Sequence, residues 1–190
     1  MIINSSMASV FDTIKMKAGD TDRSNNWYRG QVKRIASGTT ATELFRQGKL
    51  ARRPSVGRLN LFGYNPKMRK TLPYYDVFPL VLPLEAFAGG FIGMNFHYLP
   101  PLLRMRLLER MQATATDKDF DKDTKFDVTY SDVKNLGIVK PTIKKYLYPY
   151  VQTGFLRINA DEAATAIFLP VQRFKKASES RVYSDSRRFI

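Results

Sequence analysis

"LPYYDVFPLVLPLEAFAGGFIGMNFHYLPP", residues 72–101, is aromatic, interrupted by prolines and almost without charge, and it holds the only histidine, His97. Two apolar runs within it, residues 77–84 and 90–99, are joined by a glycine-containing turn. Short apolar runs between turn residues are typical of strands. Together with the alternating run at residues 58–64, they predict a three-stranded antiparallel meander, an arrangement that also builds small barrels.

Two prolines and the histidine lie within the predicted strands of this meander. Pro79 and Pro83 fall in the middle run, and each lacks the N–H that a ladder hydrogen bond needs. We therefore expect the middle strand to lie at a sheet edge or to be bent. In the last run, a strand would place His97 on the same face as Asn95 and Leu99.

The segments outside the meander show apolar spacings of three and four, which are typical of amphipathic helices. The predicted helices cover residues 23–37, 42–47, 100–112 and 140–152, with a short one at 161–166. We expect Thr42 to cap the second of these, and Asn159 or Asp161 to cap the last. Two short strands are predicted at 155–158 and 167–171. The fold class is therefore α+β: a small antiparallel β-barrel or meander sheet flanked by helices.

The chain has room for one hydrophobic core. It has 190 residues, of which 44% are hydrophobic, and a second full domain would be cramped. We expect a core domain at residues 57–172. A helical and basic extension, residues 1–56, precedes it, and a basic tail, residues 173–190, follows it.

The net charge of +14 is concentrated at the two ends of the chain. Residues 1–75 hold 14 Lys/Arg against 4 Asp/Glu, residues 76–172 hold 11 of each, and residues 173–190 hold 6 against 2. Extended basic arms on a neutral body commonly contact nucleic acid or an acidic protein surface, because releasing counterions from phosphates favours binding. A merely solvated surface is the alternative.

Fourteen lysines and arginines of these arms are candidate phosphate- or partner-binding residues. They are Arg23, Arg29, Lys33, Arg34, Lys49, Arg52, Arg53, Arg58, Arg173, Lys175, Lys176, Arg181, Arg187 and Arg188. None has the spacing of a base-reading motif, so contact with DNA would be directed at its backbone and would lack sequence specificity.

Signs of catalysis or of a cofactor are weak. Without cysteine and with one histidine, the chain can build no cysteine- or histidine-rich metal site, and we expect His97 to be a hydrogen-bonded structural residue. Tyr74 and Tyr75 could stack a base, although aromatic residues between apolar strands more often belong to a core. We expect no enzyme and no cofactor.

The charged loop at residues 114–127 contains an aspartate motif. Asp119, Asp121 and Asp123 have the D-x-D-x-D spacing that opens a calcium loop. Thr124 replaces the required glycine and Tyr130 the bidentate glutamate, so we expect a solvated acidic loop. A magnesium-dependent nuclease built on these aspartates is a distant alternative.

Membrane insertion and export are not expected from the sequence. No uninterrupted apolar run approaches the roughly 20 residues that span a bilayer. The first residues, MIINSSMASVF, lack the pattern of a secretory signal.

Two long runs carry a family resemblance. GRLNLFGYNPKMRKTLPYYDVFPLVLPLEAFAGGFIGMNFHYLPPLLRMRLL, residues 57–108, resembles a signature of small virion proteins of contractile-tailed bacteriophages, especially the T-even-like group. ATAIFLPVQRFKKASESRVYSDSRR, residues 164–188, is similar to the closing part of the same proteins, and GDTDRSNNWYRGQVK, residues 19–33, matches more loosely. The resemblance implies a protein of the virion, made in the host cytoplasm.

The resemblance implies one of two roles. The first is a structural joint of the neck, tail or baseplate, which docks on other virion proteins through its basic arms. Its interfaces would hold Tyr28, Arg52, Arg53, Arg181 and Phe189. The second is a head-completion protein that binds duplex DNA through phosphates and protects the ends of the packaged genome.

Overall fold

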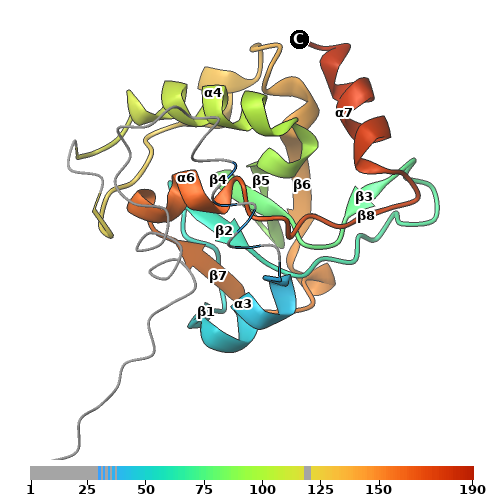
Figure 1. Cartoon of the computed structure of the whole chain (residues 1–190), viewed down its shortest axis with the longest axis horizontal. Coiled ribbons are helices and arrows are strands. Elements are labelled where there is room, and N and C mark those ends of the chain that lie inside the picture. The colour runs from blue at the N-terminus through green and yellow to red at the C-terminus, as the bar shows by residue number, and fades with distance from the viewer. Residues whose placement is uncertain (1–29, 31, 33, 35, 37, 118–120) are drawn as a thin grey trace, which may run out of the picture.

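The computed structural model describes residues 30, 32, 34, 36, 38–117 and 121–190, and its centre is a six-stranded antiparallel sheet (Figure 1). The strand order is β1-β7-β2-β4-β5-β6. These strands are β1 (Leu50–Ala51), β2 (Leu59–Leu61), β4 (Leu80–Phe87), β5 (Gly90–Asn95), β6 (Ile143–Leu147) and β7 (Phe155–Ile158). A separate ribbon pairs β3 (Tyr75–Asp76) with β8 (Phe174–Lys175). The predicted α+β class with a meander is confirmed.

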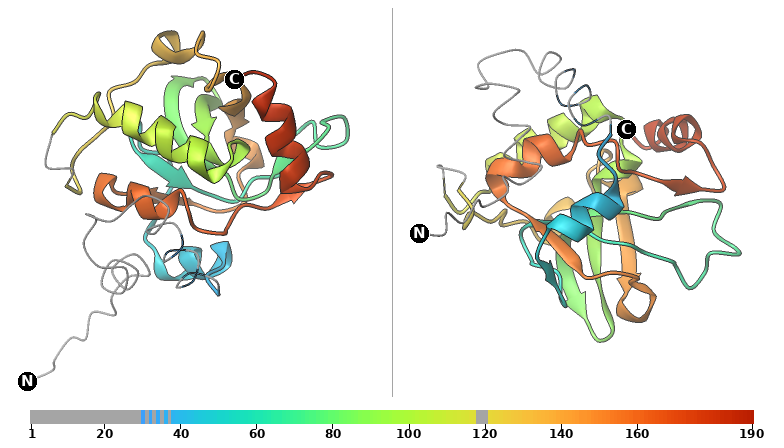
Figure 2. Two further views of the ribbon diagram at one scale, coloured as in Figure 1. Left: turned by 45° about the horizontal axis from the view of Figure 1, so that its top comes forward. Right: turned by 60° about the horizontal axis from the view of Figure 1, so that its bottom comes forward.

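Helices and short 3₁₀ turns surround the sheet. The helices are α3 (Ala41–Gln47), α4 (Pro101–Gln112), α5 (Tyr130–Val133), α6 (Ala163–Ala166) and α7 (Glu179–Arg187). The turns are η1 (Phe96–Tyr98), η2 (Lys140–Thr142), η3 (Tyr148–Tyr150) and η4 (Ala160–Glu162). Helices α4 and α7 lie side by side at one end of the molecule, and α3 lies at the other end near β1 (Figures 1 and 2).

Of the two predicted sheet forms, the chain adopts the open one. Strands β1 and β6 are the two edges and do not pair with each other in the described part of the chain. One corner does curl over, because Tyr64 forms a bridge with Val151 and the Gln152 N–H donates to the Gly63 carbonyl at 2.8 Å. The curl encloses an aromatic cluster without closing a barrel.

Strand β4 shows how the prolines are accommodated. It begins as a central strand, because Leu80 and Val81 pair with β2 while the other side pairs with β5. The register shifts between Pro83 and Glu85, which marks a bulge. At Pro83 the pairing with β2 has already ended, so the missing N–H removes no hydrogen bond on that side. The middle strand is therefore bent, as predicted, and it is not an edge strand.

Both faces of the sheet are buried at its centre. Leu80 and Leu82 of β4 belong to the larger core under the helices, whereas Val81 belongs to an aromatic cluster on the other face. Phe62 is the centre of that cluster, and its ring centroid lies 4.8 Å from that of Phe155 and 5.3 Å from that of Tyr146. The strand predicted from the alternating run at 58–64 is present as β2, but all three of its residues are buried because both faces are covered there, so the alternation does not mark an exposed face.

The helix predicted over residues 140–152 is wrong. This segment forms η2, then β6 as the sheet edge against β5, then η3. Its apolar residues fit a helical spacing as well as a strand, but Pro141 and Pro149 each lie in a 3₁₀ turn at one end of β6 and restrict the backbone there. The strand buries Tyr146 in the aromatic cluster, which decides between the two patterns.

Two smaller predictions also differ from the structure. The strand predicted over 167–171 is instead a continuation of α6 in turns, with the Ile167 N–H donating to the Ala163 carbonyl at 3.1 Å. His97 lies in η1 and not in a strand. The Asn95 side chain accepts a hydrogen bond from the His97 main-chain N–H and so begins the turn.

The helix caps differ from prediction at one of two positions. Thr40 caps α3 in place of the predicted Thr42, and its side chain accepts from the Glu43 N–H at 3.2 Å. Asn159 begins η4, where its N–H donates to Glu162, so the first of the two predicted caps is the one used. The predicted helices over 42–47, 100–112 and 161–166 are present with small shifts of their ends.

The C-terminal tail is folded, although we predicted an extended arm. Strand β8 pairs with β3, and Ser178 caps α7 by accepting from the Arg181 N–H at 3.3 Å. Val182 and Ser186 of α7 are buried. The Ser186 hydroxyl donates to the Tyr98 carbonyl at 2.7 Å and so attaches the helix to η1.

The N-terminal prediction is tested only in part. Gly30, Val32 and Arg34 are helical, and Val32 is fully buried. Most other residues of the helix predicted over 23–37 lie outside the described part of the chain. Among the helices that the structure describes, none is long and apolar enough to cross a membrane.

Candidate nucleic-acid interface

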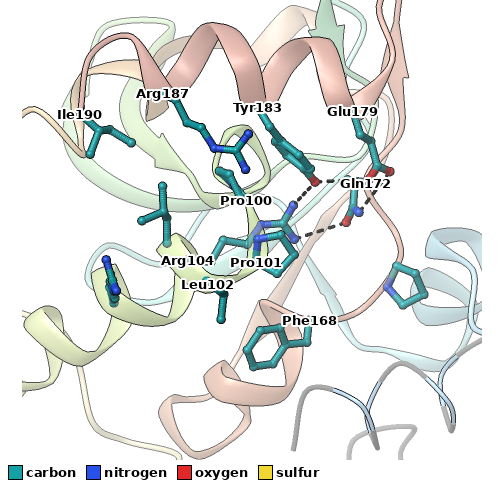
Figure 3. Close-up of a pocket in the computed structure, with 13 residues that line it drawn as sticks. Pro100, Pro101, Leu102, Arg104, Phe168, Gln172, Glu179, Tyr183, Arg187 and Ile190 are labelled. Atoms are coloured by element: carbon teal, nitrogen blue, oxygen red, sulfur yellow. Dashed lines mark hydrogen bonds between the residues drawn. The ribbon is translucent and has the colours of Figure 1, made fainter. Parts of the chain in front are cut away.

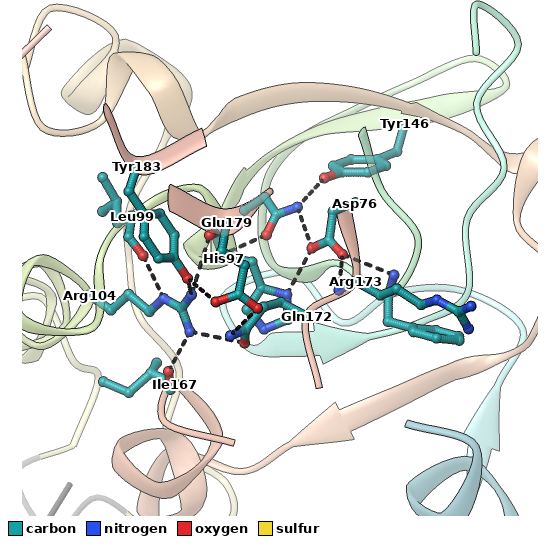
Figure 4. A network of polar contacts seen from close by, with 12 residues as sticks. Asp76, His97, Leu99, Arg104, Tyr146, Ile167, Gln172, Arg173, Glu179 and Tyr183 are labelled. Atoms are coloured by element: carbon teal, nitrogen blue, oxygen red, sulfur yellow. Dashed lines mark hydrogen bonds and ion pairs between the residues drawn. The ribbon is translucent and has the colours of Figure 1, made fainter. Parts of the chain in front are cut away.

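Asp76 and His97 form the centre of a buried polar network (Figure 4). The two side chains meet at 2.8 Å between Oδ2 and Nδ1, and both are essentially inaccessible. The Asp76 carboxylate also accepts from the main-chain N–H groups of Phe78 and Arg173 and from the Asn95 amide. This carboxylate therefore joins β3, β5, η1 and the start of the C-terminal tail.

His97 is a structural residue in this geometry. Burial lowers the pKa of its imidazole, and the attraction of Asp76 opposes this only in part. Its Nε2 atom is buried and meets no acceptor among the described residues, as expected for a neutral ring that donates from Nδ1. The ring has no exposed surface, so no substrate reaches it.

Arg104 of α4 is a buried cation whose donors are all used inside the protein. Its Nε donates to the Leu99 carbonyl at 2.7 Å. One terminal nitrogen donates to the Ile167 carbonyl and more weakly to Gln172, and the other donates to the His97 carbonyl and to the Tyr183 hydroxyl at 2.8 Å (Figure 4). These bonds account for all five N–H groups of a guanidinium. Arg104 therefore holds α4, η1, α6 and α7 together.

A pocket of about 800 Å³ lies beside this arginine, between α4 and α7 (Figure 3). Tyr183 and Gln172 each accept a hydrogen bond from Arg104 and each donate one to Glu179. The Glu179 carboxylate is therefore linked to the guanidinium indirectly, once through each of these side chains. Much of the remaining wall is apolar. It is formed by Pro100, Pro101, Leu102, Leu103, Phe168, Pro170 and Ile190, with Arg106 and Arg187 as further cations.

A second pocket, of about 420 Å³, has a different chemistry. It lies between the loop that follows β2, the start of β6 and the C-terminal end of α7. Five tyrosines line it: Tyr64, Tyr74, Tyr75, Tyr98 and Tyr146. We call it the tyrosine pocket. Burial raises the pKa of the Tyr74 and Tyr98 hydroxyls, so both stay neutral at neutral pH.

Lys144 is a half-buried cation in the lining of the tyrosine pocket. Its Nζ donates to the Pro141 carbonyl at 2.7 Å and lies 4.1 Å from the centre of the Tyr98 ring. Burial lowers the pKa of this ammonium to about 8. Among the described residues, no carboxylate lies within ion-pair distance of it.

Exposed cations lie at the tyrosine pocket and next to it. Lys140 lines the pocket, and Asp185, which also lines it, pairs with Arg181 at 3.0 Å and with Arg188 at 3.8 Å. The loop whose ends, Pro66 and Leu72, line the pocket carries the exposed residues Lys67, Arg69 and Lys70. The surroundings of the pocket therefore carry a net positive charge.

Comparison with known proteins identifies the family. A family model described as "Phage T4 terminal DNA protecting protein" matches residues 1–189. The chain belongs to this family. The resemblance to virion proteins of T-even-like phages is thereby confirmed over nearly the whole chain. No curated protein and no solved structure shows a significant match.

The N-terminal candidates of this member of the terminal DNA protecting family are only partly placed. Arg23, Arg29 and Lys33 lie outside the described residues, as does Tyr28. Arg34 is exposed on its helical segment.

The candidates next to β1 divide into exposed and buried residues. Lys49, Arg52 and Arg53 are exposed, and the Arg53 guanidinium lies 4.1 Å from the centre of the Tyr148 ring. Arg58 was expected on an exposed arm, and this expectation is wrong. It is only 7% exposed, and its guanidinium donates to the main-chain carbonyls of Lys122 and Asp123. The arm is thus attached to the charged loop instead of projecting from the body.

The six candidates of the C-terminal tail are all exposed. They are Arg173, Lys175, Lys176, Arg181, Arg187 and Arg188. The fold brings Arg181 and Arg188 to the tyrosine pocket and Arg187 to the pocket between α4 and α7. Lys176 is held by the protein itself. Its ammonium donates to the main-chain carbonyls of Arg69, Lys70 and Leu72 in the loop between β2 and β3.

The aspartate motif folds back on its own chain. One carboxylate oxygen of Asp121 accepts from the N–H groups of Asp123 and Thr124 and from the Thr124 hydroxyl, while Asp119 lies outside the described residues. Groups of three or more metal-ligating side chains are not found in the described ranges.

Sequence reasoning missed Lys140 and Lys144 as site residues. The helix predicted over residues 140–152 hid them, and only the correct strand register shows that the consecutive lysines of β6, Lys144 and Lys145, diverge. Lys144 faces Tyr98, whereas the Lys145 ammonium lies 4.4 Å from the centre of the Phe87 ring. The prolines around β6 were the signal that could have corrected the assignment.

Proposed function

We infer that this protein is a virion component of a T4-like phage that binds the ends of packaged duplex DNA and protects them. The observation that carries the proposal is the match of residues 1–189 to a family described as terminal DNA protecting proteins. This favours the second of the two roles that the sequence suggested, the DNA-binding head-completion protein.

The charge distribution supports contact with DNA through phosphates. The chain carries a net charge of +14, and the fold places Lys140 and Lys144 in the lining of the tyrosine pocket and pairs Arg181 and Arg188 with Asp185, which also lines it. Phosphate contacts by lysine and arginine position a protein on a duplex and read no sequence. Binding without sequence choice suits a protein that protects whatever sequence lies at the end.

The structural-joint role is the second candidate, and one observation favours it as a second role beside DNA-end protection. The pocket between α4 and α7 has an apolar rim, in which Leu102 and Ile190 are about half exposed. Other phage proteins are the partners that such a rim fits within a virion. The two roles are compatible, because this rim and the cations of the tyrosine pocket line different pockets.

The test is binding of the purified full-length protein to linear and circular duplexes of one sequence at about 50 and 200 mM salt. We expect affinity to fall by orders of magnitude over this range, because each neutralised phosphate contributes about 0.9 to the log–log slope. We also expect linear DNA to compete better than circular DNA. Equal competition by both forms would contradict end protection, and salt-insensitive binding would contradict the phosphate contacts.

Protection itself is measured by the lifetime of the linear duplex in the presence of a processive exonuclease. The protein should extend that lifetime at a ratio of a few molecules per end, far below the amount that coats the whole duplex. Protection only at coating ratios would show general DNA binding and would count against the proposal.

A further inference from the structure

Binding to phosphates along a duplex does not by itself distinguish an end from the interior. An end differs in its terminal nucleotide, which stacks on one neighbour only and unpairs at lower cost than an interior nucleotide. A terminal phosphomonoester also carries more charge than an internal phosphodiester, since its second pKa is about 6. A site that recognises ends therefore needs room for one nucleotide, a surface for its base and a cation for its phosphate.

We propose that the tyrosine pocket receives the terminal nucleotide of a duplex DNA end, with Lys144 contacting its phosphate and Tyr74 stacking on its base. This inference rests on the proposed function and names the site through which ends are recognised. The volume of about 420 Å³ is in the range of small-ligand sites, which is roughly 300 to 1,000 Å³. Tyr74 is half-buried at the pocket, and its ring centroid lies 6.0 Å from that of Tyr98.

Lys144 has donors to offer a phosphate. An ammonium has three N–H groups, and the single hydrogen bond found for this one goes to the Pro141 carbonyl. The Tyr98 ring face attracts the cation without using a hydrogen-bond donor. An anion entering the pocket would meet an enclosed positive charge, which interacts more strongly than one in open water.

The other charged groups at the pocket favour an anion on balance. Lys140 lies on the rim, and the Lys145 ammonium is directed to Phe87 and away from Lys144. Of the two carboxylates in the lining, Asp76 is held by four hydrogen-bond donors, including His97. The second, Asp185, has Arg181 and Arg188 as its ion-pair partners.

The pocket between α4 and α7 does not meet the same requirements. Arg104 is its buried cation, but all five of its N–H groups are already directed at protein acceptors. A phosphate could bind Arg104 only by breaking bonds that hold the helices together. The larger pocket is thus the poorer phosphate site.

Protonation of Lys144 gives the proposal a pH dependence. The protonated ammonium binds phosphate, and in the free protein burial lowers its pKa to about 8. Preference for ends should therefore decline as the pH rises from 7 to 9, although surface lysines and arginines remain charged over that range. The general affinity for DNA should stay unchanged over this pH range, because it depends on exposed cations such as Lys140, Arg181 and Arg188, which remain charged.

The test compares Lys144→Met with the matched control Lys145→Met, its neighbour on the same strand. The probe is a blunt 5′-phosphorylated duplex, competed with a circular duplex and with a duplex closed by hairpins at both ends. We expect wild-type protein and K145M to prefer the open duplex, and K144M to lose that preference by on the order of tenfold while it keeps its salt-sensitive affinity for circles.

A second pair of variants tests the base contact. Tyr74→Ala should weaken end binding by roughly tenfold, as measured for loss of base–aromatic stacking, whereas Tyr74→Phe keeps the ring and should bind like wild type. If wild-type protein prefers ends and K144M and Y74A keep that preference, the pocket assignment is wrong and the proposed function stands. If wild-type protein shows no preference for ends, the proposed function itself fails.

Discussion

Arg104 and Lys144 are both enclosed cations without a carboxylate in direct contact among the described residues, yet the fold treats them in opposite ways. Arg104 directs five N–H groups at three main-chain carbonyls, Tyr183 and Gln172. Lys144 makes one hydrogen bond, to Pro141, and rests on the face of Tyr98. The first cation is satisfied by the protein and the second is left able to bind a ligand.

The difference shows why the size of a pocket is a poor guide to its function. The pocket beside Arg104 is about twice as large as the tyrosine pocket, but its cation is part of the scaffold. The smaller pocket combines aromatic walls, an available cation and a positive border. Counting unused hydrogen-bond donors separates a structural cation from a binding cation more reliably than burial does.

Removing Arg104 should have the largest effect on stability. Arg104→Met leaves the carbonyls of Leu99, Ile167 and His97 buried without a donor, and each such acceptor costs about 1 to 3 kcal/mol. We expect the free energy of unfolding in urea to fall by about 3 kcal/mol or more. Arg104→Lys keeps a charge but offers three donors in place of five, so it should lose an intermediate amount. A loss under about 1 kcal/mol for R104M would contradict the role assigned to this network.

Acid should weaken the same network through His97. Burial lowers the pKa of His97 below its ordinary 6.5, so below that pH the unfolded chain binds a proton that the folded chain does not. Stability is then complete above about pH 6.5 and falls on acidification by up to about 1.4 kcal/mol per pH unit.

The measurement for His97 is a series of urea unfolding curves between pH 7.5 and 5.5. His97 is the only histidine, so no other imidazole titrates in this window. The control His97→Gln should be less stable at pH 7.5 but insensitive to pH across the window. A wild-type curve that is flat over this range would show that folding does not lower the pKa of His97.

Removing Lys144 should have the smallest effect, and one of opposite sign. Because burial lowers its pKa to about 8 from an ordinary 10.5, folding at pH 7 places an ammonium where it is poorly solvated. Lys144→Met should therefore leave stability unchanged or raise it by about 1 kcal/mol. The wild type, but not the variant, should gain stability from pH 7.5 to 9, as the folded chain releases a proton that the unfolded chain keeps. A marked loss of stability in K144M would place Lys144 with Arg104 as a structural cation.

Much of the fold could be predicted from local sequence patterns. The meander followed from two apolar runs between turn residues, and Pro101 followed by apolar residues at helical spacing predicted α4. Segment 140–152 failed because Ile143, Tyr146, Leu147 and Tyr150 fit a helix and a strand equally well. Only the aromatic cluster, assembled from distant strands, decides between them.

The candidate site was harder to predict than the fold. Charge counts selected Arg181, Arg188 and Arg58 alike, and they cannot distinguish the two exposed arginines from Arg58, which long-range contacts with residues 122 and 123 bury. The tyrosine pocket joins residues separated by more than 100 positions, such as Tyr74 and Asp185. No local pattern encodes that proximity, because it depends on α7 folding back onto η1 through Ser186.

The central claim is that a DNA end occupies the tyrosine pocket and contacts the Lys144 ammonium, whereas the Lys145 ammonium, which faces Phe87, takes no part. The most direct measurement is the rate at which each lysine is acetylated at pH 8, read by mass spectrometry without DNA, with linear duplex and with circular duplex. Lys144 should react readily in the free protein, because a pKa of about 8 leaves much of it as the reactive neutral amine. The account predicts that linear duplex protects Lys144 far more than circular duplex does, while Lys145 reacts alike with both. Equal protection of Lys144 by linear and circular DNA would contradict it.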